Sequence, residues 1–378
     1  MDAAHASEAR VTPLELFFDL VFVFALTQVT AMLAADPTWA GLARGLLVLA
    51  TLWWAWAGYA WLTNEVGGED GRARLVVFLA MGAMILAALA VPGAFDEHAL
   101  LFALSYAVVR VAHLALFWVA SEDEGVQRAV LRLWPTATVG PLLLVVAAFT
   151  DGPLQGALWL AALAIDYGGP YVRGVSGYRV HAEHFAERFG LIVIIALGES
   201  IVAIGIGASS EPVTFGVGVA AVLGVACVCA LWWAYFAVVA ARKLEEVQGD
   251  VRAELARDSY AYLHLPMIGG IVLFALGLKS TLAHLDEPLE PVAAVGLCGG
   301  VALYFLAHVF FRLRNVRSLS RPRIVAAALA LATIPLALEI DALVALGVVA
   351  TLCAGLIAYE AIRYRETRAR VRLTLMRR

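Results

Sequence analysis

Long apolar segments dominate this chain and constrain its fold more than any other feature. A helix needs about 20 predominantly apolar residues to cross the hydrocarbon core of a bilayer, and about twelve segments satisfy this length. They lie near residues 14–34, 39–62, 74–92, 98–120, 132–150, 154–172, 188–208, 213–240, 259–282, 291–312, 323–339 and 341–362. The sequence therefore predicts an all-α, polytopic membrane protein of about twelve transmembrane helices.

Composition excludes a water-soluble globular domain. Hydrophobic residues make up 62% of the 378 residues and charged residues only 15%, whereas about a quarter of the residues in ordinary soluble domains are charged. The four cysteines all lie within apolar segments, and their spacing matches neither a disulfide framework nor a zinc site. We expect them to pack as buried thiols.

The positive charges indicate how the helices are oriented. With the N-terminus in the cytoplasm, every lysine and arginine except Arg44, Arg110 and Lys279 falls in the leader, a cytoplasmic loop or the tail. This distribution follows the positive-inside rule and predicts a multi-pass protein of the cell (inner) membrane with both termini cytoplasmic. The leader MDAAHASEAR lacks the positive region of a signal peptide, so we expect the first apolar segment to remain as a membrane helix. The basic tail, residues 366–378, is expected to meet anionic membrane lipid.

Three features of the first half recur in the same order in the second. Leu52-Trp53-Trp54-Ala55 is repeated as Leu231-Trp232-Trp233-Ala234, Glu15-Leu16-Phe17 is echoed by Glu187-Arg188-Phe189, and Tyr106 with Arg110 is matched by Tyr304 with His308. The sequence predicts two six-helix repeats, residues 11–172 and 181–365, which are parallel because an even number of spans returns the chain to its starting side. Transporters often bind substrate between such repeats, although duplication also builds folds with no transport role.

Ionisable side chains inside the apolar segments are the candidate functional residues, because a charge at the bilayer centre costs about 2.5–3.5 kcal/mol on insertion scales. In the first span, Glu15 and Asp19 are four residues apart and share one helical face, and Gln28 lies deeper. The positive end of the helix dipole favours both carboxylates. Glu15 can alternatively reach the cytoplasmic surface without any functional role.

The seventh span carries a second set of polar residues. Glu187 and Arg188 lie at its start, and Glu199 lies about 18 Å deeper at 1.5 Å per residue, next to Ser200. Glu199 is predicted to be either a neutral side chain hydrogen-bonded between helices or a protonatable or ion-binding site. His181, His184 and Glu187 fall on roughly one side of a helix and include metal-ligand types, but no fourth ligand accompanies them. A solvated helix entrance is the favoured interpretation there, and no metal or cofactor is predicted.

Arg110 and His113 are one turn apart in the fourth span. Arginine stays protonated in proteins, so a buried Arg110 needs an anion. Asp19 and Asp166 are candidate partners in the same half, and Glu199 is a candidate across the repeat boundary. A structural ion pair is favoured, with binding of an anion or a carboxylate substrate as the alternative. His308, alone on an apolar helix, is typical of a satisfied core histidine.

Two long motifs resemble the bacterial low temperature requirement protein A family. They are ELFFDLVFVFA, which begins at Glu15, and HFAERFGLIVIIALGES, which begins at His184. The residues that match the family's motifs are Glu15, Phe17, Phe18, Asp19, His184, Glu187, Arg188, Gly198, Glu199 and Ser200. The resemblance covers most of the chain and implies a multi-pass membrane protein linked to growth in the cold, but it assigns no catalytic residue.

The duplicated halves and the intramembrane charges favour a carrier of a small solute or ion, with possible coupling to protons. Two alternatives stay open: an intramembrane enzyme that acts on lipid, and a membrane sensor or structural protein needed for cold growth. No nucleotide-binding loop is present, so ATP hydrolysis is not expected. Nucleic-acid binding is not expected either, because the basic residues follow the topology. The expected partners are membrane lipid and a small solute or ion.

Overall fold

The computed structural model describes residues 11–65, 71–121, 123–209, 214–236 and 241–363. Within these ranges the chain is helical apart from its connections and one isolated bridge between Pro288 and Asp341. In chain order the elements are α2 (Pro13–Ala35), α3 (Trp39–Glu65), α4 (Gly71–Ala90), η1 (Val91–Gly93), α5 (Ala99–Ala120), α6 (Glu124–Ala147), α7 (Gly152–Arg173), α8 (Ala182–Ser209), α9 (Phe215–Phe236), α10 (Ala241–Glu246), α11 (Gly249–Leu255), η2 (Ala256–Tyr262), α12 (His264–Ala283), α13 (Pro291–Ala294), η3 (Val295–Gly299), α14 (Gly300–Val316), α15 (Arg321–Ala337) and α16 (Ala342–Arg363).

A helix covers most of the described part of every predicted span. Ten helical segments of the described ranges are long and apolar enough to cross a membrane. Helices α7 and α15 are not among them: α15 has only 17 residues, and α7 carries Asp166 and the sequence Gly168-Gly169-Pro170 near its end. The basic tail at residues 366–378 lies outside the described residues, as do residue 213 and residues 237–240 at the ends of the eighth predicted span.

Several helices begin earlier than hydropathy predicts. Helix α6 begins at Glu124 instead of residue 132, because the carboxylate of Asp123 caps it by accepting from the backbone N–H groups of Gly125 and Val126. Helix α8 begins at Ala182 instead of residue 188. In both helices the backbone hydrogen bonds extend into the polar residues that precede the apolar stretch. Hydropathy therefore locates the apolar part of a helix but not the residue at which the helix begins.

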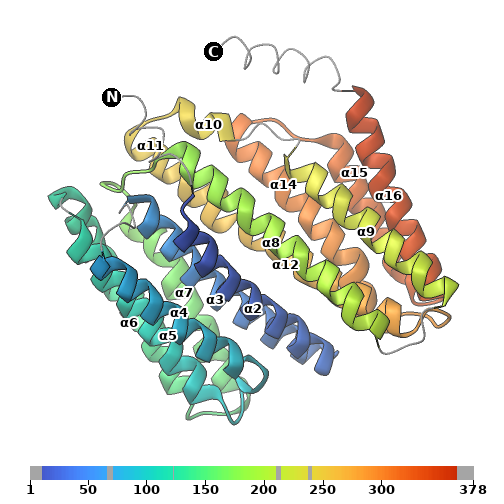
Figure 1. Cartoon of the computed structure of the whole chain (residues 1–378), viewed down its shortest axis with the longest axis horizontal. Helices are drawn as coiled ribbons and strands as arrows, with labels where there is room; N and C mark the ends of the chain where they lie inside the picture. Colours follow the sequence, from blue (N-terminus) through green and yellow to red (C-terminus); the bar gives the residue numbers. More distant parts are fainter. Residues whose placement is uncertain (1–10, 66–70, 122, 210–213, 237–240, 364–378) are drawn as a thin grey trace.

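The helices form two neighbouring groups (Figure 1). In the first group α4 packs on α2 and α5, α5 on α6, α6 on α7, and α3 on α2, α5 and α7. In the second group α12 packs on α8 and α14, α14 on α15, α15 on α16, and α9 on α8 and α16. Helices α2 and α3 meet α8 and α12 at the junction between the groups.

Glycines bring α12 and α14 into backbone contact. A Cβ atom on Gly270 would lie 2.6 Å from the carbonyl oxygen of Gly300, and one on Gly277 would lie 2.2 Å from the backbone nitrogen of Leu297. Such approaches are possible only without a side chain, as in the small-residue interfaces of membrane helices. The contact runs along the π-helical segment η3, where an extra residue per turn widens the helix.

The outer surface carries many large apolar side chains. Phe215, Val172 and Leu75 are exposed to 89%, 86% and 68%, a degree of apolar exposure that suits contact with lipid and not with water. Three of the four cysteines are buried as expected, but Cys229 is exposed, and all four are free thiols.

Candidate functional site

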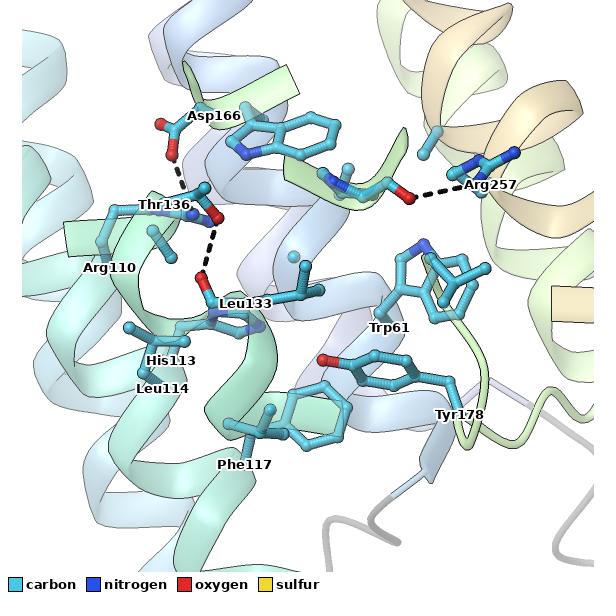
Figure 2. A pocket seen from close by; sticks show the side chains of 18 residues that line it. Trp61, Arg110, His113, Leu114, Phe117, Leu133, Thr136, Asp166, Tyr178 and Arg257 are labelled. Carbon is cyan, nitrogen blue, oxygen red and sulfur yellow. Dashed lines mark hydrogen bonds and ion pairs between the residues drawn. The ribbon is translucent and has the colours of Figure 1, made fainter. Parts of the chain in front are cut away.

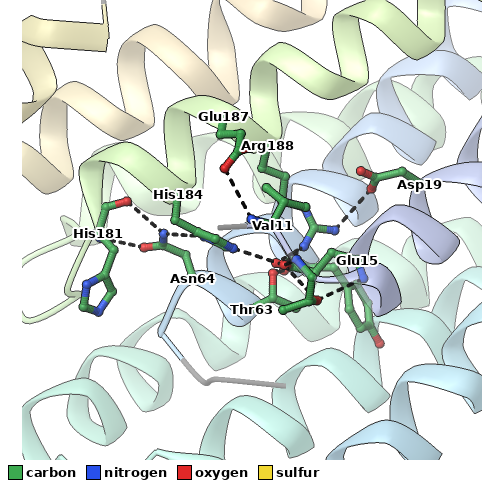
Figure 3. A network of polar contacts seen from close by, with 11 residues as sticks. Val11, Glu15, Asp19, Thr63, Asn64, His181, His184, Glu187 and Arg188 are labelled. Atoms are coloured by element: carbon green, nitrogen blue, oxygen red, sulfur yellow. Dashed lines mark hydrogen bonds and ion pairs between the residues drawn. The ribbon is translucent and has the colours of Figure 1, made fainter. Parts of the chain in front are cut away.

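A buried polar network joins α2 and α3 to α8 at the junction between the two groups (Figure 3). It begins with the N-terminus of α2, where the hydroxyl of Thr12 accepts from the backbone N–H of Glu15 and the Glu15 carboxylate accepts from the backbone N–H of Thr12. This capping box holds Glu15, which is only 3% exposed, in a fixed position. Glu15 thus lies in the first turn of α2, where the positive end of the helix dipole favours a carboxylate.

Arg188 is the centre of this network. Its guanidinium is 1% exposed and donates to Glu15 Oε1 at 2.6 Å, to Asp19 Oδ1 at 3.2 Å and to the hydroxyl of Thr63. The guanidinium carbon also lies 5.8 Å from the ring centre of Trp56, whose indole N–H donates to the same oxygen of Asp19 at 2.7 Å. One arginine thus binds both carboxylates of the first span, and cation–π contact adds to the attraction.

The network does not balance its charges with these groups alone. Glu15 and Asp19 contribute two negative charges when ionised, and Arg188 contributes one positive charge. Asn64 Nδ2 can only donate, so His184 Nδ1 accepts from it, and the Nε2–H of the neutral His184 ring donates to Glu15 Oε2 at 3.1 Å. Asp19 Oδ2 and Arg188 Nε are buried and make no hydrogen bond within the described residues. With both carboxylates ionised and His184 neutral, one negative charge is not balanced by these side chains, and an uncompensated buried charge is costly.

His181, His184 and Glu187 were considered as metal ligands. His184 belongs to the Arg188 network instead, and His181 and Glu187 lie at the edge of this network. The amide of Asn64 contacts His184 Nδ1 at 3.0 Å, and its oxygen accepts from the backbone N–H of His181 at 2.9 Å. Figure 3 shows the His181 ring turned away from the network, and Glu187 accepting from the backbone N–H of Val11 at 3.3 Å. No group of three His, Cys, Asp or Glu side chains in the described ranges is placed to hold a metal ion.

A second site lies inside the first group, where α3, α5, α6 and α7 enclose a cavity of about 90 Å³ (Figure 2). Arg110 and Asp166 line it, and the guanidinium donates to Asp166 Oδ1 at 3.3 Å. The other carboxylate oxygen of Asp166 accepts from the hydroxyl of Tyr106 at 2.9 Å. Of the three carboxylates considered as partners for Arg110, the structure pairs it with Asp166. We call this space the Arg110 cavity; its polar and aromatic lining comprises Trp54, Trp61, Arg110, His113, Phe117, Thr136, Asp166, Tyr178 and Arg257.

The Arg110 cavity contains buried donors that the protein does not use. Arg110 is 5% exposed, yet its Nε makes no hydrogen bond within the described residues, and both ring nitrogens of His113 likewise lack a bond of normal geometry there. A volume of about 90 Å³ holds several water molecules at about 10–15 Å³ each. The cavity is therefore large enough and polar enough for a small polar ligand.

Two glycines create the space around this ion pair. A Cβ atom on Gly58 would lie 3.2 Å from the His113 ring and 3.4 Å from the Arg110 guanidinium, and one on Gly140 would lie 2.8 Å from the Asp166 carboxylate. Glycine inside a helix costs about 1 kcal/mol relative to alanine. The sequence keeps glycine at both positions, where any side chain would displace the charged groups.

A second buried arginine shows what a satisfied pair looks like in this protein. Arg323 of α15 donates to both oxygens of Glu360 on α16, at 2.8 and 3.0 Å, and to the backbone carbonyl of Ala234 at 2.9 Å. This fork-to-fork geometry is the strong form of an arginine–carboxylate pair. The single 3.3 Å bond of Arg110 leaves most of its donors uncommitted by comparison, although both arginines are buried.

Glu199 takes a third position, on α8 beside α2. Its side chain is 2% exposed, and Oε2 accepts from the hydroxyl of Thr27 at 2.6 Å. Ser200 is fully buried, and its hydroxyl makes no hydrogen bond within the described residues. Gln28 is half-buried on α2. Glu199 thus accepts a hydrogen bond from a neighbouring helix, a contact that fits both of its interpretations.

His308 takes a fourth position, in the second group. It is 3% exposed, and its Nδ1 donates to the backbone carbonyl of Tyr304 at 2.9 Å, while Nε2 has no partner within the described residues. The structure therefore unites Glu15, Asp19 and Arg188, and separately unites Arg110 with His113. Glu199 and His308 join neither of these groups.

Sequence reasoning missed several members of these sites. Trp56, Thr63 and Asn64 complete the Arg188 network, and the pair of Arg323 with Glu360 was not considered. Trp56 directly follows the repeated segment Leu52–Ala55, so a search for indole N–H groups near buried acids would have found it. Thr63 and Asn64 carry no such signal, because polar residues at the end of a span usually face water.

Comparisons with known proteins agree with the motifs. The profile of the bacterial low temperature requirement A protein family matches residues 10–358. An uncharacterized protein of Rhizobium meliloti (strain 1021) is 31% identical over 310 residues, which are 79% of this chain and 76% of that protein. A match over this length includes both buried networks and nearly every described helix. The chain belongs to the bacterial low temperature requirement A family.

Proposed function

We propose that this protein is a membrane transporter that binds a small anionic solute in the Arg110 cavity. The observation that carries the proposal is the contrast between two buried arginines. Arg323 is fully engaged by Glu360 and a backbone carbonyl, whereas Arg110 lines a cavity with one long bond to Asp166. A guanidinium with uncommitted donors in a buried, aromatic-lined cavity is suited to a carboxylate or phosphate oxygen.

The proposal includes two parallel six-helix repeats, residues 11–172 and 181–365, in the cell membrane with both termini cytoplasmic. Corresponding helices pack in the same pairs, which supports the duplication. For example, α2 packs on α3 and α4 as α8 packs on α9 and α12, and α3 packs on α7 as α9 packs on α16. The predicted positions of the basic loops support the orientation. All twelve predicted spans, α7 and α15 included, would then cross the membrane.

We assign the coupling of solute transport to protons to the Arg188 network. The network lacks one positive charge when both carboxylates are ionised and His184 is neutral, and it lies where the two groups of helices meet. Taking up a proton there would remove the charge imbalance and alter the force that holds α2 to α8. Relative movement of two repeats about their junction is the usual route of alternating access.

The test is uptake by liposomes that contain the purified full-length protein. Acetate, succinate and inorganic phosphate serve as labelled probes, with and without an imposed pH gradient. We expect saturable uptake of at least one probe and its loss in Arg110→Met. Arg128→Met removes an exposed arginine and should leave uptake unchanged. Absence of saturable uptake of all three probes in the wild type, or full uptake by Arg110→Met, would contradict the proposal.

A second candidate function also has a specific observation behind it. Asp19, Arg110, Glu199 and His308 do not share one cavity, and Glu199 is hydrogen-bonded between α8 and α2. Scattered, separately held polar groups suit a non-transporting sensor or structural protein, whose loss impairs cold growth indirectly. The same liposomes separate the two functions, because a structural protein would give no saturable flux while Arg188→Met would still lower its stability.

A further inference from the structure

A third cavity, of about 290 Å³, lies between the start of α8 and the ends of α9 and α14, and it is independent of the Arg110 cavity. Its charged lining consists of three glutamates, Glu183 and Glu187 of α8 and Glu245 of α10. Its lining also includes Tyr235 and His308. None of the three carboxylates forms an ion pair with a side chain of the described ranges. We call this space the His308 cavity.

The hydrogen-bonding state of His308 follows from its neighbours. The backbone carbonyl of Tyr304 can only accept, so the His308 nitrogen that lies 2.9 Å from it, Nδ1, carries the hydrogen. In the neutral ring the other nitrogen, Nε2, is then an acceptor. Nε2 is buried, has no partner in the described residues, and belongs to a side chain that lines the cavity. A buried acceptor without a donor is costly unless a ligand supplies one.

The same reasoning fixes the direction of the Tyr235 hydroxyl. The backbone carbonyl of Ser259 accepts from His264 Nδ1 at 2.9 Å, so His264 Nε2 is an acceptor. Tyr235 lies 2.9 Å from that Nε2 and must donate its hydroxyl hydrogen to it. The Tyr235 oxygen therefore keeps only acceptor positions for any other partner. Two inner polar atoms of the His308 cavity, one from Tyr235 and one from His308, are thus both acceptors.

We propose that the His308 cavity binds a primary ammonium group. Glutamates at its edge attract a cation, and acceptors from Tyr235 and His308 receive N–H donors inside. Aromatic side chains of the lining, Phe236, Tyr260 and Phe311, add faces that favour a cation over a neutral solute. A primary ammonium carries three donors and one positive charge, which matches the acceptor-rich lining, whereas an anion would meet repulsion from the glutamates.

The ammonium group can belong to a free amine or to the headgroup of phosphatidylethanolamine, and two measurements distinguish these sources. The first is titration calorimetry of the full-length protein in detergent with butylammonium, with tetramethylammonium, which has no N–H donor, and with butyrate. We expect butylammonium to bind at least tenfold more tightly than either of the others. The second is native mass spectrometry of protein released from nanodiscs made with phosphatidylethanolamine or with phosphatidylcholine.

Two sets of variants test the residues. His308→Phe removes the acceptor and keeps an aromatic ring, and it should weaken butylammonium binding at least tenfold. Glu183→Gln with Glu187→Gln removes two exposed charges, and the amide oxygen at position 187 can still accept from the backbone N–H of Val11. The double variant should therefore raise Kd and reduce its dependence on salt even if His308→Phe fails to fold. Glu254→Gln, an exposed acid on α11, is the matched control and should bind like the wild type.

Each result has a defined meaning. Butylammonium binding that is lost in the glutamine double variant supports a free amine as ligand. Retention of phosphatidylethanolamine by the wild type and its loss in His308→Phe supports the headgroup. The proposal is overturned if neither ligand binds the wild type, if tetramethylammonium binds as tightly as butylammonium, or if the double variant binds unchanged. None of these results depends on anion uptake through the Arg110 cavity.

Discussion

Arg188 Nη1 donates to Glu15 Oε1 at 2.6 Å, although the two residues are 173 positions apart in the chain. The bond connects α8 to α2, the first helices of the two groups. Both side chains are at most 3% exposed, so the pair lies in a low-dielectric setting where its partners cannot be replaced by water. This bond and the one to Asp19 make Arg188 the main electrostatic link across the junction.

Removing the guanidinium should therefore destabilise the protein strongly. In Arg188→Met, the carboxylates of Glu15 and Asp19 stay buried without their cation, and loss of one partner of a buried pair costs about 3–5 kcal/mol. Thermal unfolding in detergent, followed by tryptophan fluorescence, should show a large decrease in Tm. Arg128→Met, at an exposed position of α6, is the control and should unfold near the wild-type temperature. A wild-type Tm for Arg188→Met would show that the network contributes little to stability.

Gly58→Ala should impair ligand binding more than stability. The new Cβ would lie 3.2 Å from the His113 ring and 3.4 Å from the Arg110 guanidinium, so the charged groups must shift by a few tenths of an ångström. We expect anion affinity to fall about tenfold, which corresponds to about 1.4 kcal/mol, while Tm changes little. Gly82→Ala adds a methyl group where no atom lies within 4 Å and is the matched control. Equal affinity in both variants would separate Gly58 from the binding site.

Glu199→Gln tests whether this carboxylate carries a proton. The amide oxygen of glutamine can still accept from Thr27, so the fold should be retained with a stability change of about 1 kcal/mol or less. If Glu199 takes part in coupling, uptake driven by a pH gradient should be abolished in this variant while exchange without a gradient persists. Thr27→Val, which removes the donor but not the carboxylate, is the companion variant. Wild-type gradient-driven uptake in Glu199→Gln would assign Glu199 a structural role.

The cap of α6 gives a prediction about pH. Backbone N–H groups of Gly125 and Val126, together with the charge of Arg179, hold the pKa of Asp123 below its usual value of 3.8. Because the folded pKa is lower than the unfolded one, the carboxylate adds stability above about pH 4, and this stability is lost as the pH falls toward the folded pKa. The difference in Tm between wild type and Asp123→Asn should thus be largest near neutral pH and shrink below pH 4. A difference that is constant over this range would contradict the assignment.

Hydropathy located the membrane-crossing helices because a span of hydrocarbon imposes a length and an apolar composition that few other constraints imitate. Hydropathy located the start of α2 to within one residue but missed the start of α6 by eight, since the cap at Asp123 depends on local backbone geometry in polar sequence. The motif residues Glu15, Asp19 and Arg188 were identified, but their mutual contact was not, because charge pairing between distant helices depends on packing angles that no local pattern encodes.

The partner of Arg110 likewise could not be identified from the sequence alone. Electrostatics required a carboxylate and reduced the choice to Asp19, Asp166 and Glu199. The decision among them came from the position of α7 beside α5 and α6, with Gly140 leaving room for Asp166. The cavity could not be predicted, because it is set by the combined volumes of side chains from four helices.

The glycine contact between α12 and α14 has a mechanical consequence. Where main chains touch at Gly270 and Gly300, no layer of flexible side chains remains to absorb sliding or tilting. Helices α12 and α14 are therefore expected to move together as one rigid unit. Any conformational change must occur at helix interfaces that are packed less tightly. The junction of α2 with α8 is held by side-chain charges instead of touching main chains, so it is the interface where movement is expected.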